Sequence, residues 1–333
     1  MWKQASLFAL VTALAACSGG DRPNPVNGQD PDEPTTPVEP VPDIVIPAAI
    51  LSDLESLRLD VGDPNDPSDD TLIVTGLNLD TGEVDGVYER APEADVPGYR
   101  AFSTQDDRLD RIFVALYAEA AEGAVYAGAV GDGGQFDKFF RGIYYDREGD
   151  FTPPTESGLV SYGGRYAAVT NFGTNDPTLV EEGPRPNDPP AVPRQPLLLT
   201  GEVFFNVDFA DNSMNGVVYN RRFEDGTPTG DTLFLDPTEI SETGTFEGDV
   251  LQETQESLDN QEPPRGVGTY AGVFGGENAE GMAGGLTAAS HLPSVEPDDR
   301  AIESGIFVIP RCGAAGSPTF CDGLGDFDGP IGE

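Results

Sequence analysis

The stretch LLLTGEVFFNVDFADNSMNGVVYNRRF, residues 197–223, contains two strand-like segments joined by a turn. In its first half, the apolar side chains of Val203, Phe205 and Val207 alternate with polar neighbours. A two-residue period of this kind is typical of a β-strand that buries one face. The Asp-Asn-Ser segment at 211–213 has the composition of a turn. The stretch therefore predicts an antiparallel hairpin with one buried face.

Similar segments on both sides bring the number of predicted strands to eight. They span residues 160–172, 197–210, 214–223, 231–236, 243–251, 268–276, 281–289 and 301–310. Most connections are short and rich in Gly, Asp or Pro, and residues 174–196 form the one long loop. Eight antiparallel strands with no long helix to cover an open edge favour a closed up-and-down barrel, filled by side chains or admitting a small ligand. A β-sandwich of similar strands is the alternative.

The preceding region has a weaker β pattern. Residues 72–79 (LIVTGLNL) read as a strand. Residues 106–122 fit one face of a helix, but they also alternate as a strand that can pair with 124–130 through a Glu122-Gly123 turn. We expect the hairpin, spanning about 111–130, and therefore an all-β chain.

The segment GVGTYAGVFGGENAEGMAGGL, residues 266–286, has glycines at offsets where backbones cross or turn tightly. It resembles the signature hairpin of the transferrin-binding protein B β-barrel lipoprotein family. The matching parts are Gly-Val-Phe-Gly at 272–275, Asn-Ala-Glu at 278–280 and Gly-Gly at 284–285, whereas Gly276, Glu277 and Gly281 depart from the usual residues. Segments 201–218 and 240–250 resemble the strand pairs before this hairpin, so the resemblance covers about 158–310.

The resemblance implies a fold and, more loosely, a function. It implies an eight-stranded antiparallel β-barrel domain at 158–310, preceded by a smaller handle-like β region at 48–157. Members of the family bind transferrin, complement factor H or haemoglobin, or are predicted solute-binding proteins without a known ligand. Contacts in the transferrin binders come largely from a handle domain and from loops, which find no residue-by-residue match here. No binding residue is therefore carried over.

The N-terminus has the pattern of a lipoprotein signal peptide. Lys3 precedes an apolar stretch, and Leu-Ala-Ala at 14–16 stands directly before Cys17. We expect residues 1–16 to be removed and Cys17 to carry acyl chains, palmitate among them, that hold the protein stably at a membrane. Ser18 favours the outer membrane of a Gram-negative bacterium, with its cell-surface or periplasmic face left open. A secreted protein with a chance cysteine is the alternative.

Residues 17–47 are rich in Pro and Asp and are almost free of large apolar side chains before Ile44. Such a segment cannot bury enough surface to fold. We expect a disordered tether that holds the folded part away from the membrane.

Charge limits the partners. The formal net charge is −41, and removal of residues 1–16, whose only charge is Lys3, changes it to −42. Nucleic acid and anionic lipid surfaces are poor partners for such a chain, because phosphate binding depends on Lys and Arg. A basic partner or cations fit the charge, as does simple solubility in a saline environment.

Two further cysteines, Cys312 and Cys321, lie in the C-terminal tail at 311–333. An exported chain with two cysteines beyond the lipidated one is expected to pair them as a disulfide. A metal site lacks further ligands nearby, and a redox pair is usually closer in sequence.

Aromatic side chains concentrate around two cations in GGQFDKFFRGIYYDREGDF, residues 133–151. The candidate ligand-binding residues are Phe136, Phe139, Phe140, Arg141, Tyr144 and Tyr145. Aromatic and Arg clusters are favoured at binding hot spots. A strand with one buried face gives the same pattern and is the alternative.

Few residues suit catalysis or metal binding. The single histidine, His291, follows Ser290 and has no Gly-x-Ser-x-Gly motif with it, so we expect exposed polar surface there, no enzyme and no cofactor. Candidate calcium ligands are Asp63, Asp66, Asp69 and Asp70, and Asp326 with Asp328. Neither run has the spacing of an EF-hand loop, so we expect solvated loops and no metal site.

The function that these features predict is binding. We expect an outer-membrane lipoprotein that captures a protein or small solute at the cell envelope, with metal or nutrient uptake as one role. The alternative is a structural or protective envelope lipoprotein without a dedicated soluble ligand.

Overall fold

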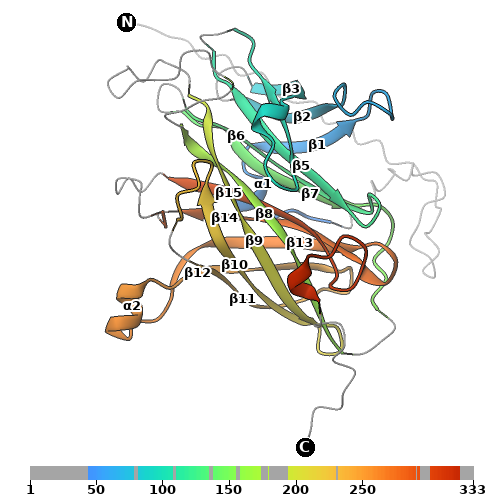
Figure 1. The fold of residues 1–333 in the computed structure, drawn as a ribbon, viewed down its shortest axis with the longest axis vertical. Helices are drawn as coiled ribbons and strands as arrows, with labels where there is room; N and C mark the ends of the chain where they lie inside the picture. The colour runs from blue at the N-terminus through green and yellow to red at the C-terminus, as the bar shows by residue number, and fades with distance from the viewer. Residues whose placement is uncertain are drawn as a thin grey trace, which may run out of the picture. The chain divides into compact units, whose positions relative to one another are not determined.

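The structure is a computed structural model. It describes residues 44–78, 82–107, 110–134, 138–154, 158–173, 179, 194–229, 232–289, 291–292 and 301–322. These residues form an all-β fold with a few short helical turns (Figure 1). No helix in these ranges has both the length and the apolar character needed to span a membrane.

Fifteen strands follow one another in these ranges. The first seven are β1 (Leu54–Asp60), β2 (Thr71–Asn78), β3 (Gly82–Arg90), β4 (Arg100–Thr104), β5 (Phe113–Ala120), β6 (Val125–Asp132) and β7 (Arg141–Arg147). The next eight are β8 (Leu159–Gly173), β9 (Pro196–Asp208), β10 (Ser213–Phe223), β11 (Leu233–Glu239), β12 (Thr245–Gln252), β13 (Arg265–Gly275), β14 (Gly281–Ala289) and β15 (Ile302–Pro310). The helical turns are α1 (Ala48–Leu51), η1 (Pro92–Ala94), α2 (Gln255–Asn260), η2 (Glu277–Ala279) and η3 (Thr319–Cys321).

Strands β8–β15 form a closed barrel. Each strand pairs antiparallel with the next one along the chain, and β15 pairs with β8 to close the circle. The eight strands coincide with the eight segments that the sequence predicts. The up-and-down barrel is therefore confirmed, and the β-sandwich alternative is wrong.

Strands β1–β7 form one antiparallel sheet in chain order. The predicted strand at 72–79 is β2, and the hairpin expected over 111–130 is β5 followed by β6. The helical alternative for 106–122 is wrong. The sequence did not predict β1, β3 or β4.

The two faces of this sheet have different neighbours. One face, called here the outer face, packs its apolar side chains against the barrel, with β6 and β7 lying on β14 and β15. The opposite or inner face carries a separate apolar cluster, which includes Leu57, Val74, Phe102, Ala115 and Phe140. A third cluster fills the barrel.

Small side chains bring the sheet and the barrel close together. Ala127 on the sheet and Ala271 and Ala283 on the barrel belong to the shared cluster. At Gly285, a Cβ atom would lie 2.6 Å from the Ile143 side chain, so the contact requires a glycine. The buried Tyr99 hydroxyl adds a polar tie, because it donates to the Arg165 carbonyl at 2.8 Å.

The β13–β14 hairpin explains the glycines that carry the family resemblance. Gly272 pairs with Gly284 across the two strands. A Cβ on Gly284 would lie 2.3 Å from the Ala271 carbonyl oxygen, and Gly276 in the turn has a φ of 79°. Both positions therefore favour glycine for steric reasons.

The predicted signal peptide, Cys17 and nearly all of the predicted tether lie outside the described residues. The last part of that tether is described, and it packs: Ile44 and Ile46 contact the cluster shared by sheet and barrel. The folded part therefore begins before residue 48. The boundary expected at 157/158 lies between β7 and β8 and stays a prediction.

Candidate functional site

The aromatic segment at 133–151 does not form a single surface. Phe140 is buried in the inner-face cluster, whereas Tyr145 is buried in the cluster against the barrel. Phe139 is half-buried, and its ring lies where a Cβ on Gly134 would be. Phe136 lies outside the described residues.

Arg141 and Tyr144 also point to different neighbours. Arg141 donates through Nη1 to the Thr287 hydroxyl on β14 at 3.0 Å, and through its backbone N–H to Asp53 at 3.1 Å. Tyr144 is half-buried and packs against the inner-face cluster. Alternation along β7 thus divides the candidate ligand-binding residues between two faces, as the strand interpretation expects.

On the inner face, Tyr144 lies near two other tyrosine side chains. The ring of Tyr126 lies between those of Tyr117 and Tyr144, with centroid separations of 6.1 Å and 6.4 Å. These three side chains are called here the tyrosine cluster. Tyr117 is buried and the other two are half-buried.

A charged cluster lies inside the barrel. Glu303 on β15 faces Arg221 on β10, and the side chains of both are fully buried. The guanidinium approaches both carboxylate oxygens, with Nε to Oε1 at 3.3 Å and Nη2 to Oε2. Tyr166 on β8 donates its hydroxyl proton to Oε1 at 2.6 Å.

His291, just after β14, completes this cluster, and its side chain is also fully buried. Its Nε2 lies 2.7 Å from Oε2 of Glu303. Because a carboxylate only accepts, the proton of this contact belongs on Nε2. The expectation of an exposed polar histidine is therefore wrong.

The electrostatics of the cluster follow from this pairing. Burial alone would raise the pKa of Glu303, but Arg221 and the hydrogen bond from His291 outweigh burial and hold that pKa well below its ordinary value. Glu303 is therefore a carboxylate with four donors around it. An isolated charge at this depth would be costly, and the bidentate Arg makes its burial tolerable.

This arrangement does not assemble a nucleophile. The contacts of His291 Nε2 are Glu303 and Arg221, and Nδ1 has no hydrogen-bond partner among the described residues. A Ser-His-Asp triad centred on His291 is therefore not formed within the described part of the chain.

The acidic loop between β1 and β2 uses its carboxylates internally. Asp69 accepts the backbone N–H of Asp63 at 3.0 Å, Asp66 accepts that of Ser68 at 3.1 Å, and Asp70 is paired with Arg100. Among the described residues, no three His, Cys, Asp or Glu side chains are grouped to hold a metal ion. Asp326 and Asp328 lie outside the described residues.

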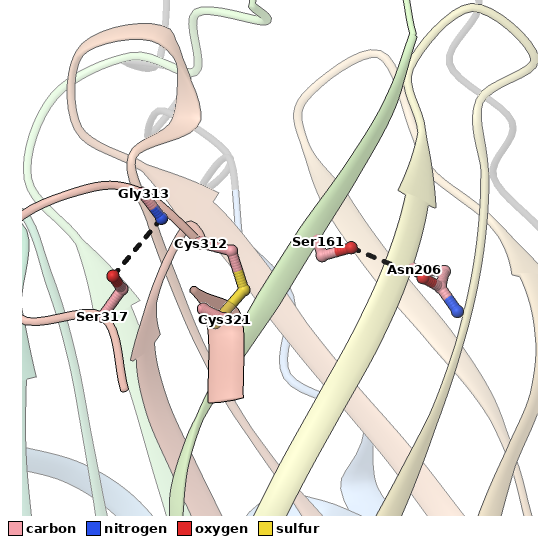
Figure 2. The surroundings of a disulfide bond; sticks show 6 residues. All are labelled: Ser161, Asn206, Cys312, Gly313, Ser317 and Cys321. Carbon is pink, nitrogen blue, oxygen red and sulfur yellow. Dashed lines mark hydrogen bonds between the residues drawn. A yellow bond between two sulfur atoms is a disulfide. The ribbon is translucent and has the colours of Figure 1, made fainter. Parts of the chain in front are cut away.

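The disulfide between Cys312 and Cys321 is present, and Figure 2 shows it beside β8. The backbone N–H of Cys312 donates to the Ser161 carbonyl at 2.8 Å, which ties the loop to β8. At the other end of the loop, Phe320 lies over Gly163 and makes an edge contact with Phe204. The loop thus covers part of the outer wall of the barrel at β8 and β9.

No family model matches the sequence, and no curated protein matches it. Solved structures of Transferrin Binding Protein B are similar in fold. A double mutant of the vaccine antigen from Haemophilus parasuis Hp5 is 11% identical with a TM-score of 0.39, over 78% of this chain and 54% of that one. Intact Ap-TbpB, with its N and C lobes, is 11% identical with a TM-score of 0.37, over 72% and 52%.

The isotype 1 protein from serogroup B Neisseria meningitidis is 15% identical with a TM-score of 0.31, over 78% of this chain and 52% of that one. The present chain thus spans about half the length of these proteins. A likeness at this level concerns the fold alone and says nothing of what the chain binds.

Proposed function

We propose that this chain is an exported, lipid-anchored envelope protein that captures a protein partner on the surface of its folded part. The observation that carries the choice of a protein over a small solute is the filled barrel. Seven aromatic side chains, each no more than 4% exposed, occupy its interior: Tyr162, Tyr166, Phe205, Phe246, Tyr270, Phe274 and Phe307. A ligand bound within the barrel would have to displace them.

Side chains fill the barrel interior toward both of its ends. Toward the β9–β10 and β13–β14 turns, Phe209 and Phe151 pack on Phe274, with centroids 5.1 Å and 6.2 Å from it. Toward the other end stands the paired Arg221–Glu303 cluster. These contacts support recognition on loops and outer surfaces, where a protein partner binds.

The sequence supports the anchoring. Cys17 is the last residue of a complete lipobox, Leu-Ala-Ala-Cys at 14–17. The Pro-rich tether fits a protein that is held away from a membrane. The resemblance of the β13–β14 hairpin to a family of anchored binding lipoproteins is consistent with this proposal. In this proposal the chain is located at the outer membrane, and palmitate is part of its anchor. Uptake of a metal or nutrient is one role that capture of a protein could serve. Binding without catalysis is proposed.

The anchor is tested by metabolic labelling with palmitate. We expect the full-length chain to take up label and fractionate with membranes, and a Cys17→Ala variant to do neither. Digestion of whole cells with an added protease then distinguishes a surface location from a periplasmic one.

Partner capture is tested separately with the mature chain, carrying Cys17→Ser and immobilised on beads. We expect a saturable protein ligand to be retained from the organism's surroundings or envelope, and its binding to be reproduced with purified material. If no purified protein binds across growth conditions, the structural or protective alternative replaces the proposal.

A further inference from the structure

The strand register fixes the positions of the three side chains in the tyrosine cluster. Tyr117 on β5 and Tyr144 on β7 are both paired with Gly128 on the strand between them. The Leu57 side chain lies over Gly128, 2.6 Å from where a Cβ would be. Tyr126 precedes Gly128 by two residues on the same strand, so its side chain points to the same face, and its ring lies near those of both Tyr117 and Tyr144.

Two carboxylates flank the cluster in the same way. Glu119 and Asp146 are the register partners of Tyr126 on its two sides, so all three side chains share the inner face. The hydroxyls of Tyr126 and Tyr144 both lie 3.3 Å from Oδ2 of Asp146, and the hydroxyl of Tyr117 lies 3.3 Å from Glu119. The carboxylates thus lie at the hydroxyl edges of the rings.

Among the described residues, no Lys, Arg or His forms an ion pair with either carboxylate. In the part of the chain that the structure describes, their side-chain contacts are the tyrosine hydroxyls, and Asp146 also accepts the backbone N–H of Arg147. Arg100, which lies over the Tyr117 ring, has its guanidinium already paired with the buried Asp70 at 2.7 Å. The cluster therefore keeps a local negative charge.

Arg100 also shows how a cation fits such a surface. Its guanidinium lies over the Tyr117 ring, 5.4 Å from the centroid, while it pairs with a carboxylate. Tyr144 and Asp146 offer the same combination, a half-exposed ring with a carboxylate at its edge. Burial and then Asp146 raise the pKa of Tyr144 to about 12, so the hydroxyl stays protonated and keeps its hydrogen bond to Asp146.

We infer that Tyr126, Tyr144, Asp146 and Glu119 form a contact surface for an arginine side chain of the protein partner. An aromatic face attracts a cation through its quadrupole, and a planar guanidinium can stack on the ring while it pairs with a carboxylate. The formal net charge of −41 makes a basic partner complementary to the whole chain. This inference rests on the proposed function, since it names the chemistry of the captured partner.

The test uses the full mature chain, with Cys17→Ser, grown with 3-fluorotyrosine so that each tyrosine reports by 19F NMR. The probe is the peptide acetyl-Gly-Arg-Gly-Arg-Gly-amide, and the control peptide has citrulline in place of arginine. We expect the arginine peptide to shift the Tyr126 and Tyr144 resonances, assigned by Tyr126→Phe and Tyr144→Phe, and to leave that of buried Tyr162 in place. The citrulline peptide should bind about tenfold more weakly or not at all.

Matched variants separate the site from the general acidity of the chain. Asp146→Asn and, independently, Glu119→Gln should each weaken the peptide about tenfold. Glu239→Gln removes the same charge from the exposed end of β11 and should leave binding unchanged. Asp146→Asn and Glu119→Gln are tested separately so that misfolding of one does not remove the test. The thermal unfolding midpoint of each variant shows whether it is folded.

Two outcomes overturn the inference. In the first, Glu239→Gln weakens the peptide as much as Asp146→Asn, which would mean that only the overall charge attracts it. In the second, the Tyr126 and Tyr144 resonances do not respond to the arginine peptide, whether or not they respond to calcium chloride. Either leaves the capture of a protein partner standing, because that is measured on immobilised protein without reference to the tyrosine cluster.

Discussion

The barrel and the sheet before it are both antiparallel meanders, yet only the barrel closes. Strand β15 pairs with β8, whereas β1 and β7 are the ends of their ladder and are linked just before β1, where the Asp53 N–H donates to the Arg141 carbonyl at 3.0 Å. Closure removes edges and seals the barrel interior. The sheet keeps one face partly open, and its half-buried tyrosines lie there.

This difference separates two roles. The sealed barrel holds Glu303 and Arg221 as a fully buried ion pair, which suits a rigid support. The open sheet holds buried and half-buried aromatic rings whose hydroxyls donate to the carboxylates of Glu119 and Asp146. The difference also suggests where variants should affect stability and where they should affect binding.

The largest expected effect is in the barrel. Arg221→Met removes the guanidinium that pairs with Glu303 at 0% side-chain exposure, and we expect a loss of about 3–5 kcal/mol in the free energy of unfolding. Urea denaturation at pH 7 measures it. The double variant Arg221→Met with Glu303→Leu should recover part of the loss, because no charge then remains buried but Tyr166 and His291 lose their acceptor.

The sheet offers the matched comparison. Arg111 pairs with the buried Asp132 at 3.0 Å, but burial raises the pKa of Asp132 to about 6, so this carboxyl can take up a proton when its partner is lost. Arg111→Met should therefore cost only about 1–3 kcal/mol at pH 6. Equal losses for the two Arg variants would contradict the contrast between barrel and sheet.

The sequence predicted the barrel better than the sheet, for physical reasons. Barrel strands bury one face completely, so their apolar residues alternate clearly and polar turns separate them. Strand β3 (GEVDGVYER) carries acids on a partly exposed sheet, and β4 has only five residues. Neither pattern stands out from a polar loop.

The charged cluster could not be predicted from local pattern. Glu303 and Arg221 are 82 residues apart, and Glu303 and Tyr166 are 137 apart. One signal was present: Glu303 shares the inward parity of Phe307 and Ile309 on β15, a position where a charge requires a partner. The register shift between Tyr219 and Arg222 hid the inward position of Arg221.

Loss of the disulfide should have the next largest effect. The Cys312–Cys321 bond closes a short loop, and the double variant Cys312→Ser, Cys321→Ser should lower the free energy of unfolding by about 2–3 kcal/mol through chain entropy. Denaturation of the oxidised wild-type chain with and without reductant provides an independent comparison. The 19F resonances of the tyrosine cluster should not move, since the loop packs on Gly163 and Phe204 of the barrel and not on the inner face of the sheet.

A smaller effect is expected where the sheet contacts the barrel. At Gly285 a Cβ would lie 2.6 Å from Ile143 and 2.8 Å from the Gly305 carbonyl oxygen. Gly285→Ala should lower stability by about 1–3 kcal/mol and should speed protease cleavage between β7 and β8. Gly266→Ala, where a Cβ would meet nothing within 4 Å, is the control and should be near neutral.

The smallest expected effect is on how stability depends on pH, because the sheet and the barrel each contribute only one carboxyl, Asp132 and Glu303. The folded-state pKa of Asp132 is raised from 3.8 to about 6, chiefly by burial, so its contribution to stability is full below pH 3.8 and is lost as the pH rises through about 6. Glu303 behaves in the opposite way: its pKa is held below 4.5, so its contribution to stability is present above that pH and is lost as the pH falls further.

Urea midpoints of Asp132→Asn and Glu303→Gln, each compared with wild type from pH 3.5 to 7, measure both contributions. The gap between Asp132→Asn and wild type should shift in favour of the variant as the pH rises from 4 to 6, while Glu303→Gln should lose least at the acid end. A parallel pH response in the two variants would mean that the open sheet and the closed barrel treat a buried carboxyl alike.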